Sequence, residues 1–173
     1  MNEDVLYTLA KVAVTLGGFS GVVVGLRLRG ESGWSATELR VLWLLIGDSF
    51  LVLFFSLLPV PMALAAWAPA TIWGWCNALL GTWFIVGNLI ALRGERRERA
   101  SQGLVRVPVI TALFQFVFVA ALAMGAALWL GALDVVVMRG QAVYVTGLMV
   151  LLAFASLEFL FFIGLASKEA EGS

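Results

Sequence analysis

Histidine is absent from the 173-residue chain, and there is a single cysteine, Cys76. The lack of histidine excludes His-ligated zinc or haem, a Ser-His-Asp triad and a histidine proton shuttle. One cysteine can form neither an internal disulfide nor a CxxC redox pair, so we interpret Cys76 as a small apolar residue in a helix. We therefore expect no catalytic residues, no metal site and no cofactor, and we do not expect an enzyme.

Charged residues are scarce, at 13% of the chain, and 11 basic residues balance 11 acidic ones. This balance gives no argument for a nucleic-acid partner. The first four residues, Met-Asn-Glu-Asp, are acidic. A secretory signal needs a positively charged start and a small-residue cleavage site, so we expect the first apolar run to be retained as a helix.

Apolar residues make up 62% of the chain, with seven tryptophans and twelve phenylalanines, a composition typical of a membrane protein. Five apolar runs reach the length of about 20 residues that a spanning helix needs. They cover residues 5–27, 38–58, 70–92, 107–130 and 141–166. Because backbone groups in lipid must be satisfied within the segment, the sequence predicts an all-α fold: one integral membrane domain, 1–173, formed by a bundle of five transmembrane helices. Pro59 and Pro61 should end the second helix.

The basic residues lie almost entirely on one side of the predicted spans. Nine of the eleven share that side: Arg27, Arg29, Arg40, Arg93, Arg96, Arg97, Arg99, Arg106 and Lys168. Lys11 and Arg139 lie on the other. Since Lys and Arg accumulate in cytoplasmic loops, we predict a multi-pass protein of the bacterial inner membrane, with its N-terminus outside and its C-terminus in the cytoplasm.

Two carboxylates interrupt the apolar runs, Asp48 in the second and Glu158 in the fifth. A charge near the bilayer centre costs about 2.5–3.5 kcal/mol on insertion scales, so such residues usually face a bundle interior, a cavity or a pore. At 1.5 Å per residue, Asp48 lies about 15 Å from the cytoplasmic end of its helix, and Glu158 and Gln115 about 12 Å from theirs. We interpret this layer as an ion-binding or proton-relay site. The alternative is an interhelical hydrogen-bond cluster that fixes packing.

Two ionised carboxylates in this layer would repel each other. One of them could be protonated, the two could share a proton, or a cation could lie between them. The third run places Asn77, Gly81 and Asn88 on one helical face. This face could line a wet path or pack against a neighbouring helix.

Glycine recurs every fourth residue in the first run, at Gly17, Gly21 and Gly25. Small residues four apart allow another helix to approach closely, either within one chain or between chains of an oligomer. The adjacent face carries polar and small residues: Thr8, Lys11, Thr15 and Gly18. One face could pack while the other meets water.

The eleven-residue segment 17–27, GGFSGVVVGLR, is similar to the first helix of small fluoride channels. Five spans and one-sided charge depart from that family, so no residue roles are transferred. More broadly, the GGFSG, WSATELR and FSLLP segments at 17–21, 34–40 and 55–59 resemble motifs of small bacterial multi-pass membrane proteins. That resemblance implies a membrane location but no particular activity.

Together these features lead to one functional hypothesis and one alternative. The hypothesis is a small channel or transporter subunit that forms a homo-oligomer through its first helix. Asp48 and Glu158, assisted by Gln115, would bind or relay an inorganic cation or a proton. The alternative is a non-conducting scaffold or accessory subunit of a membrane complex. In both cases the lipid bilayer is the surrounding partner.

Overall fold

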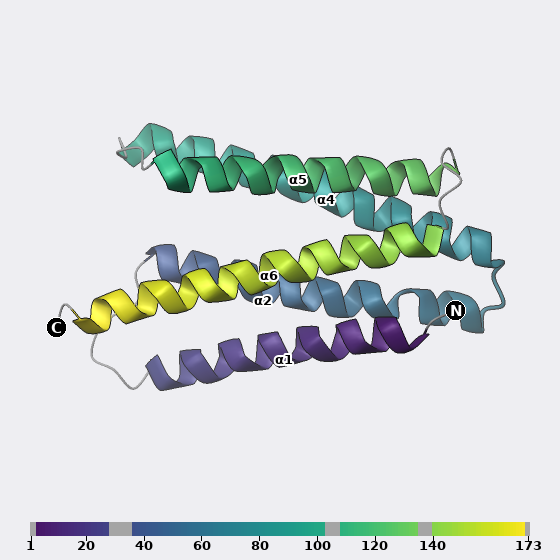
Figure 1. Cartoon of the computed structure of the whole chain (residues 1–173), viewed down its shortest axis with the longest axis horizontal. Helices are drawn as coiled ribbons and strands as arrows, with labels where there is room; N and C mark the ends of the chain where they lie inside the picture. Colours follow the sequence, from purple (N-terminus) through teal and green to yellow (C-terminus); the bar gives the residue numbers. More distant parts are fainter. Residues whose placement is uncertain (1–2, 28–35, 103–107, 135–139, 172–173) are drawn as a thin grey trace. The chain divides into compact units, whose positions relative to one another are not determined.

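The computed structural model describes residues 3–27, 36–102, 108–134 and 140–171, and within these ranges the regular structure is entirely α-helical (Figure 1). The all-α prediction is confirmed. The helices are α1 (Glu3–Arg27), α2 (Ala36–Leu57), α3 (Pro59–Leu64), α4 (Pro69–Gln102), α5 (Pro108–Ala132) and α6 (Gly140–Glu171).

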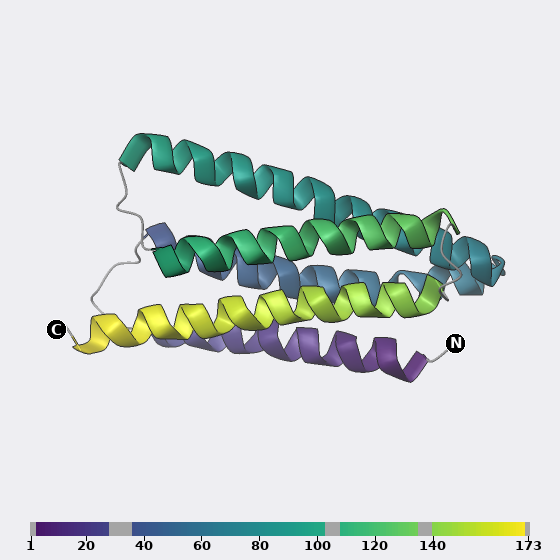
Figure 2. The same cartoon turned by 45° about the horizontal axis from the view of Figure 1, so that its top comes forward.

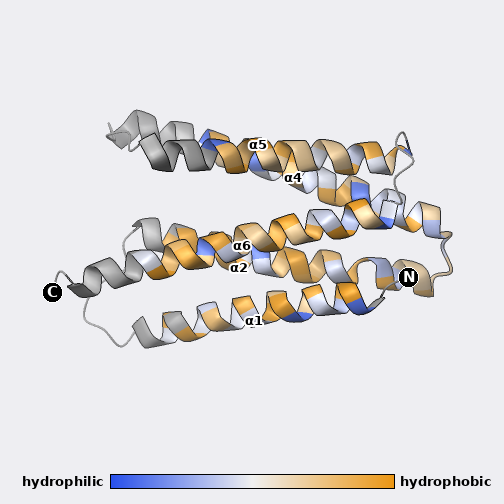
Figure 3. Cartoon of the chain, viewed as in Figure 1, coloured by the Kyte–Doolittle hydropathy of each residue, from blue (hydrophilic) through white to orange (hydrophobic). Residues whose placement is uncertain are grey.

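Five helical segments in the described residues are long and apolar enough to cross a bilayer. They are Asp4–Val22, Val41–Leu64, Pro69–Gly94, Gln115–Ala132 and Gly140–Gly164. Figure 3 shows apolar residues along the coloured part of each long helix. The protein therefore has the helices of a multi-pass membrane protein, at the positions that the hydropathy of the sequence predicts.

The second span runs beyond the prolines that were expected to end it. Helix α2 does stop at Leu57, and the N–H of Leu58 still donates to the carbonyl of Phe54 at 2.9 Å. The short helix α3 then begins at Pro59. A proline in the first turn of a helix lacks an N–H that would have no intrahelical partner there, so the two prolines interrupt the helix and also start the next one.

Two helices are much longer than a bilayer requires. Helix α4 has 34 residues and α6 has 32. At 1.5 Å per residue they extend about 50 Å, against about 30 Å of hydrocarbon. The charged run that follows Leu92 is thus helical as far as Gln102, rather than a loop.

The contacts divide the chain into two compact units. One unit combines Met1–Pro61 with Leu148–Ser173, and the other is Met62–Gly147. The chain therefore passes between units inside α3 and again inside α6. The prediction of a single membrane domain stays a prediction beside this division.

In the first unit, α1 and α2 pack against each other along most of their length. Each helix buries side chains three and four residues apart, the spacing of one helical face. These buried residues are Leu6, Leu9, Ala13 and Ser20 on α1, and Leu42, Leu45, Ser49, Val52 and Ser56 on α2.

In the second unit, α4 and α5 form the main contact, and they lie side by side in both Figure 1 and Figure 2. A close approach of the two helices occurs where Gly81 and Gly125 face each other. A Cβ atom added to Gly81 would lie 3.1 Å from the carbonyl oxygen of Gly125. One added to Gly125 would lie 2.9 Å from Cγ1 of Ile85. Only glycine fits at this crossing without displacing a neighbour.

Candidate functional site: a carboxylate pair

The first unit brings together the two carboxylates of the apolar runs. Asp48, on α2, and Glu158, on α6, lie close enough for their charges to interact. Glu158 continues a buried row of α6, spaced three and four residues apart: Leu148, Leu151, Ala155 and Phe162. Both acidic side chains are half-buried. Asp48 and Glu158 thus belong to the same unit and interact electrostatically, and their role as an ion-binding or relay site stays a prediction.

One oxygen of this pair has unused hydrogen-bonding capacity. The Oε2 atom of Glu158 is buried, and no described group donates a hydrogen bond to it. Two ionised carboxylates at short range in a low-dielectric setting repel strongly. A proton or a cation bound at the pair would remove this repulsion and would give Oε2 a partner.

The acid pair offers few side-chain ligands for a metal ion. Among the described residues, no group of three or more His, Cys, Asp or Glu side chains gathers where it could hold a metal ion. Calcium takes six to eight oxygen ligands, and magnesium requires a near-ideal octahedron. Two carboxylates alone supply fewer oxygen ligands than either divalent ion takes.

Two serines of α2 add to the buried polar groups of the first unit: Ser49, which lies close in depth to the acidic layer, and Ser56, which sequence reasoning did not single out. Ser49 and Ser56 are both buried, and within the described part of the chain neither hydroxyl has a hydrogen-bond partner. By contrast, Ser20 donates to the carbonyl of Leu16 at 2.9 Å, as membrane serines commonly do. The spacing of Ser49 and Ser56 with Leu45 and Val52 is the sequence signal that places them on the packing face.

Gln115, the third predicted member of the acidic layer, lies on α5 and belongs to the second unit. Its side chain is exposed. Its depth in the membrane was the basis for grouping it with the acids, and its participation stays a prediction.

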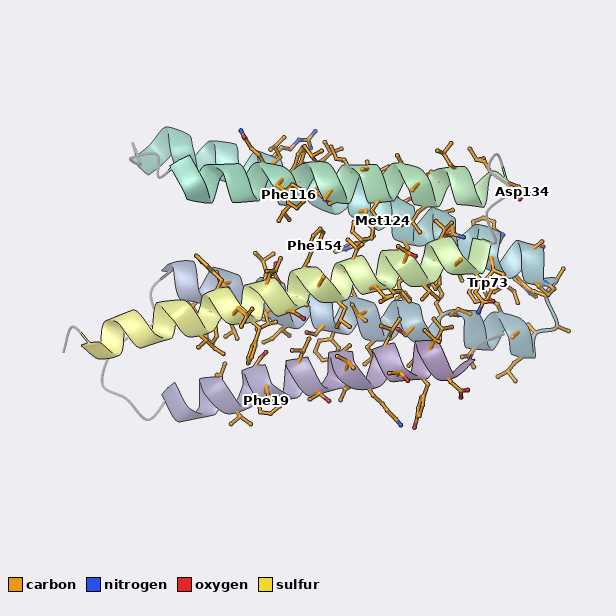
Figure 4. The ribbon with its side chains drawn as sticks, viewed as in Figure 1. Phe19, Trp73, Phe116, Met124, Asp134 and Phe154 are labelled. Atoms are coloured by element: carbon orange, nitrogen blue, oxygen red, sulfur yellow. The ribbon has the colours of Figure 1, made fainter. Side chains whose placement is uncertain are left out.

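Asn77 and Gly81 of α4 take part in contacts with other segments of the second unit. Asn77 is fully buried, and its Nδ2 atom donates to the carbonyls of Trp73 at 2.8 Å and Gly140 at 2.9 Å (Figure 4 labels Trp73). Gly81 lies at the contact with α5 described above, and Nδ2 of Asn88 donates to Phe84 of its own helix at 2.6 Å. These contacts favour packing over a wet path for Asn77 and Gly81.

The glycine row of α1 is only partly used within the chain. A Cβ atom added to Gly17 would lie 3.7 Å from Cβ of Ser49, an ordinary van der Waals contact with α2. At Gly21 and Gly25 an added Cβ atom would meet no described atom within 4 Å, and both residues are exposed. The row therefore contributes one residue to the α1–α2 contact and leaves two facing outward.

Cys76 is fully buried on α4 and forms a hydrogen bond with the side chain of Tyr144. The ring of Tyr144 also lies 5.8 Å from that of Trp73, centroid to centroid. The thiol is thus part of the interior of the second unit, as expected for a small residue in a helix.

Comparison with protein-family models, with curated proteins and with solved structures gave no match for this chain. Its function is therefore argued from its own residues.

Proposed function

We propose that the protein is a subunit of a small membrane channel or transporter in which Asp48 and Glu158 bind or relay a proton or a monovalent cation. The observation that carries this proposal is the meeting of the two carboxylates across α2 and α6 in an apolar unit. A polar residue at membrane depth is costly, and a pair of like charges is more so. A transported positive charge would offset both costs.

The proposal includes a homo-oligomer. A bundle of five spans has little room for a wide aqueous path of its own, since helices pack 8–10 Å apart with side chains filling the space between them. Assembly of several copies would provide a path at the contacts between subunits. The outward-facing glycines of α1 support such assembly, because they leave room for another helix.

Ion flux into proteoliposomes containing the pure protein tests this proposal. We expect wild type to pass H⁺, Na⁺ or K⁺ down an imposed gradient. The double variant Asp48→Asn/Glu158→Gln should lose at least about tenfold of the flux, equivalent to about 1.4 kcal/mol in barrier height. The ion that passes through wild type but not through the variant identifies the transported species.

Asp134→Asn is the matched control. Asp134 is an exposed acid outside the pair, labelled in Figure 4, and its backbone φ of 55° is one that asparagine also adopts readily. Its variant should conduct as wild type does. Normal conduction by Asp48→Asn would rule out the role proposed for the acid pair.

A non-conducting scaffold or accessory subunit is the second candidate. It is favoured by the packing roles of Asn77 and Gly81 in the second unit. Under this alternative, well-folded wild type passes no ion under any gradient. Neutral amides at Asp48 and Glu158 would then preserve or raise stability, because replacing a buried charge removes its desolvation cost.

A further inference from the structure

A groove of about 300 Å³ lies between α1 and α2 in the first unit. It is lined by Ala13, Val14, Gly17, Gly18, Ser49, Phe50 and Leu53. Its walls are mostly apolar, and Gly17 and Gly18 have no side chains to fill the space above α1. Val14, Gly18 and Phe50 are exposed, so the groove opens toward the surroundings of the unit.

One polar side chain, Ser49, is among the residues that line this groove. Ser49 is 2% exposed, and its hydroxyl has no hydrogen-bond partner among the described groups. Burying a hydroxyl without a partner is unfavourable. A lipid chain could fill the groove, but it offers nothing to accept a hydrogen bond. The hydroxyl therefore indicates an occupant that carries its own polar group.

The exposed face of α1 carries a polar group that can accept a hydrogen bond. Thr15 is exposed, and its hydroxyl donates to the carbonyl of Lys11 at 2.9 Å, which leaves its oxygen free to accept. The ammonium group of Lys11 lies over the ring of Tyr7, 4.1 Å from its centroid. This contact holds the positive charge of Lys11 about one helical turn closer to the N-terminal end of α1, away from the groove.

We propose that this groove binds α1 of a second copy of the chain, with the hydroxyl of Ser49 donating to that of Thr15 across the interface. The proposal rests on the oligomer in the proposed function and names its contact surface. One-sided basic charge favours a single orientation, so copies related by symmetry meet at equal depth. Ser49 faces Gly17, which is two residues, or about 3 Å in depth, from Thr15. The small residues Gly17 and Gly18 permit the close approach that this hydrogen bond needs.

Association in lipid vesicles, followed by energy transfer or by single-molecule photobleaching of the labelled full chain, tests the interface. The informative variant is Gly18→Leu, because an added Cβ atom there meets no described atom within 4 Å and should leave the folded chain intact. We expect at least a tenfold loss of association. Gly47→Leu is the control: Gly47 is also helical, also open in the described structure, and does not line the groove. It should associate as wild type does.

Ser49→Ala provides a second, smaller change. Removing one interhelical hydrogen bond in a membrane should weaken association about threefold. In a Cys76→Ala background and with an added oxidant such as Cu(II)-phenanthroline, Gly18→Cys should form an intermolecular disulfide, whereas Leu160→Cys, at an exposed position of α6, should not.

A wild-type chain that stays monomeric in vesicles overturns this inference, and so does a Gly18→Leu variant that associates normally. Neither measurement involves ion flux. Association through the groove without conduction would therefore refute the ion-transport proposal alone, and conduction with normal association of Gly18→Leu would refute the interface alone.

Discussion

At the scale of the residue, the informative atoms are the buried polar ones. Asp48 and Glu158 stand out in the sequence because each is an acid in a long apolar run, and the structure brings them together. Ser56 does not stand out, since serine is common in membrane helices and usually bonds to its own backbone. Its unpartnered hydroxyl depends on side-chain rotamer and packing, which no sequence pattern specifies.

Replacing Ser56 by alanine should stabilise the protein. The hydroxyl is buried and has no partner among the described atoms, and alanine also has the higher helix propensity. We expect a gain of about 1 kcal/mol in the free energy of unfolding, measured in detergent or bicelles. Ser20→Ala is the control: its hydroxyl does have a partner, so its removal should bring no such gain. Equal gains from both variants would mean that the gain comes from helix propensity and not from removing an unpartnered hydroxyl.

At the scale of the element, glycine spacing alone does not identify the partner of a helix face. The sequence draws attention to the row at Gly17, Gly21 and Gly25, yet a tight helix contact is found at Gly81 and Gly125. Spacing within one helix shows that a face is smooth, but not which helix meets it. That choice depends on both partners, and Gly81 and Gly125 are 44 positions apart in the chain.

A methyl group at Gly125 should therefore weaken the contact between α4 and α5. The added Cβ atom would lie 2.9 Å from Ile85 and 3.2 Å from Cβ of Phe84, so the helices must move apart. We expect Gly125→Ala to cost about 1–3 kcal/mol of stability, the usual range for overpacking. Gly21→Ala, with open space around it, should instead gain up to about 1 kcal/mol from helix propensity. A neutral Gly125→Ala variant would contradict this packing.

At the scale of the whole molecule, composition was sufficient for the number and position of the spans. Each of the five predicted runs overlaps a membrane-length helix. The ends of α4 at Gln102 and of α6 at Glu171 lie beyond the predicted apolar runs, because hydropathy marks the end of the apolar run rather than the end of the helix. Hydropathy also does not predict the grouping of the helices into two units, since that grouping depends on which helix faces meet.

Orientation remains a prediction of the charge distribution, and thiol labelling can test it. In a Cys76→Ala background, a membrane-impermeant thiol reagent added to intact spheroplasts should modify Asp134→Cys, at the end of α5. It should not modify Ser101→Cys, near the end of α4, until the membrane is permeabilised. The reason is the excess of Lys and Arg on the side that carries residue 101. The reverse labelling pattern would invert the topology.

The chain crosses from one unit to the other at two places, and this bears on how it can bend there. Both lie within helices, at Pro61–Met62 in α3 and at Gly147–Leu148 in α6, rather than in loops. A loop absorbs a change of direction by rotating a few dihedral angles, whereas a helix bends only by lengthening its hydrogen bonds or at a proline. Helix α6 thus runs without a break from residues of the second unit to Glu158 of the first, whereas α3 contains prolines, where helices commonly bend.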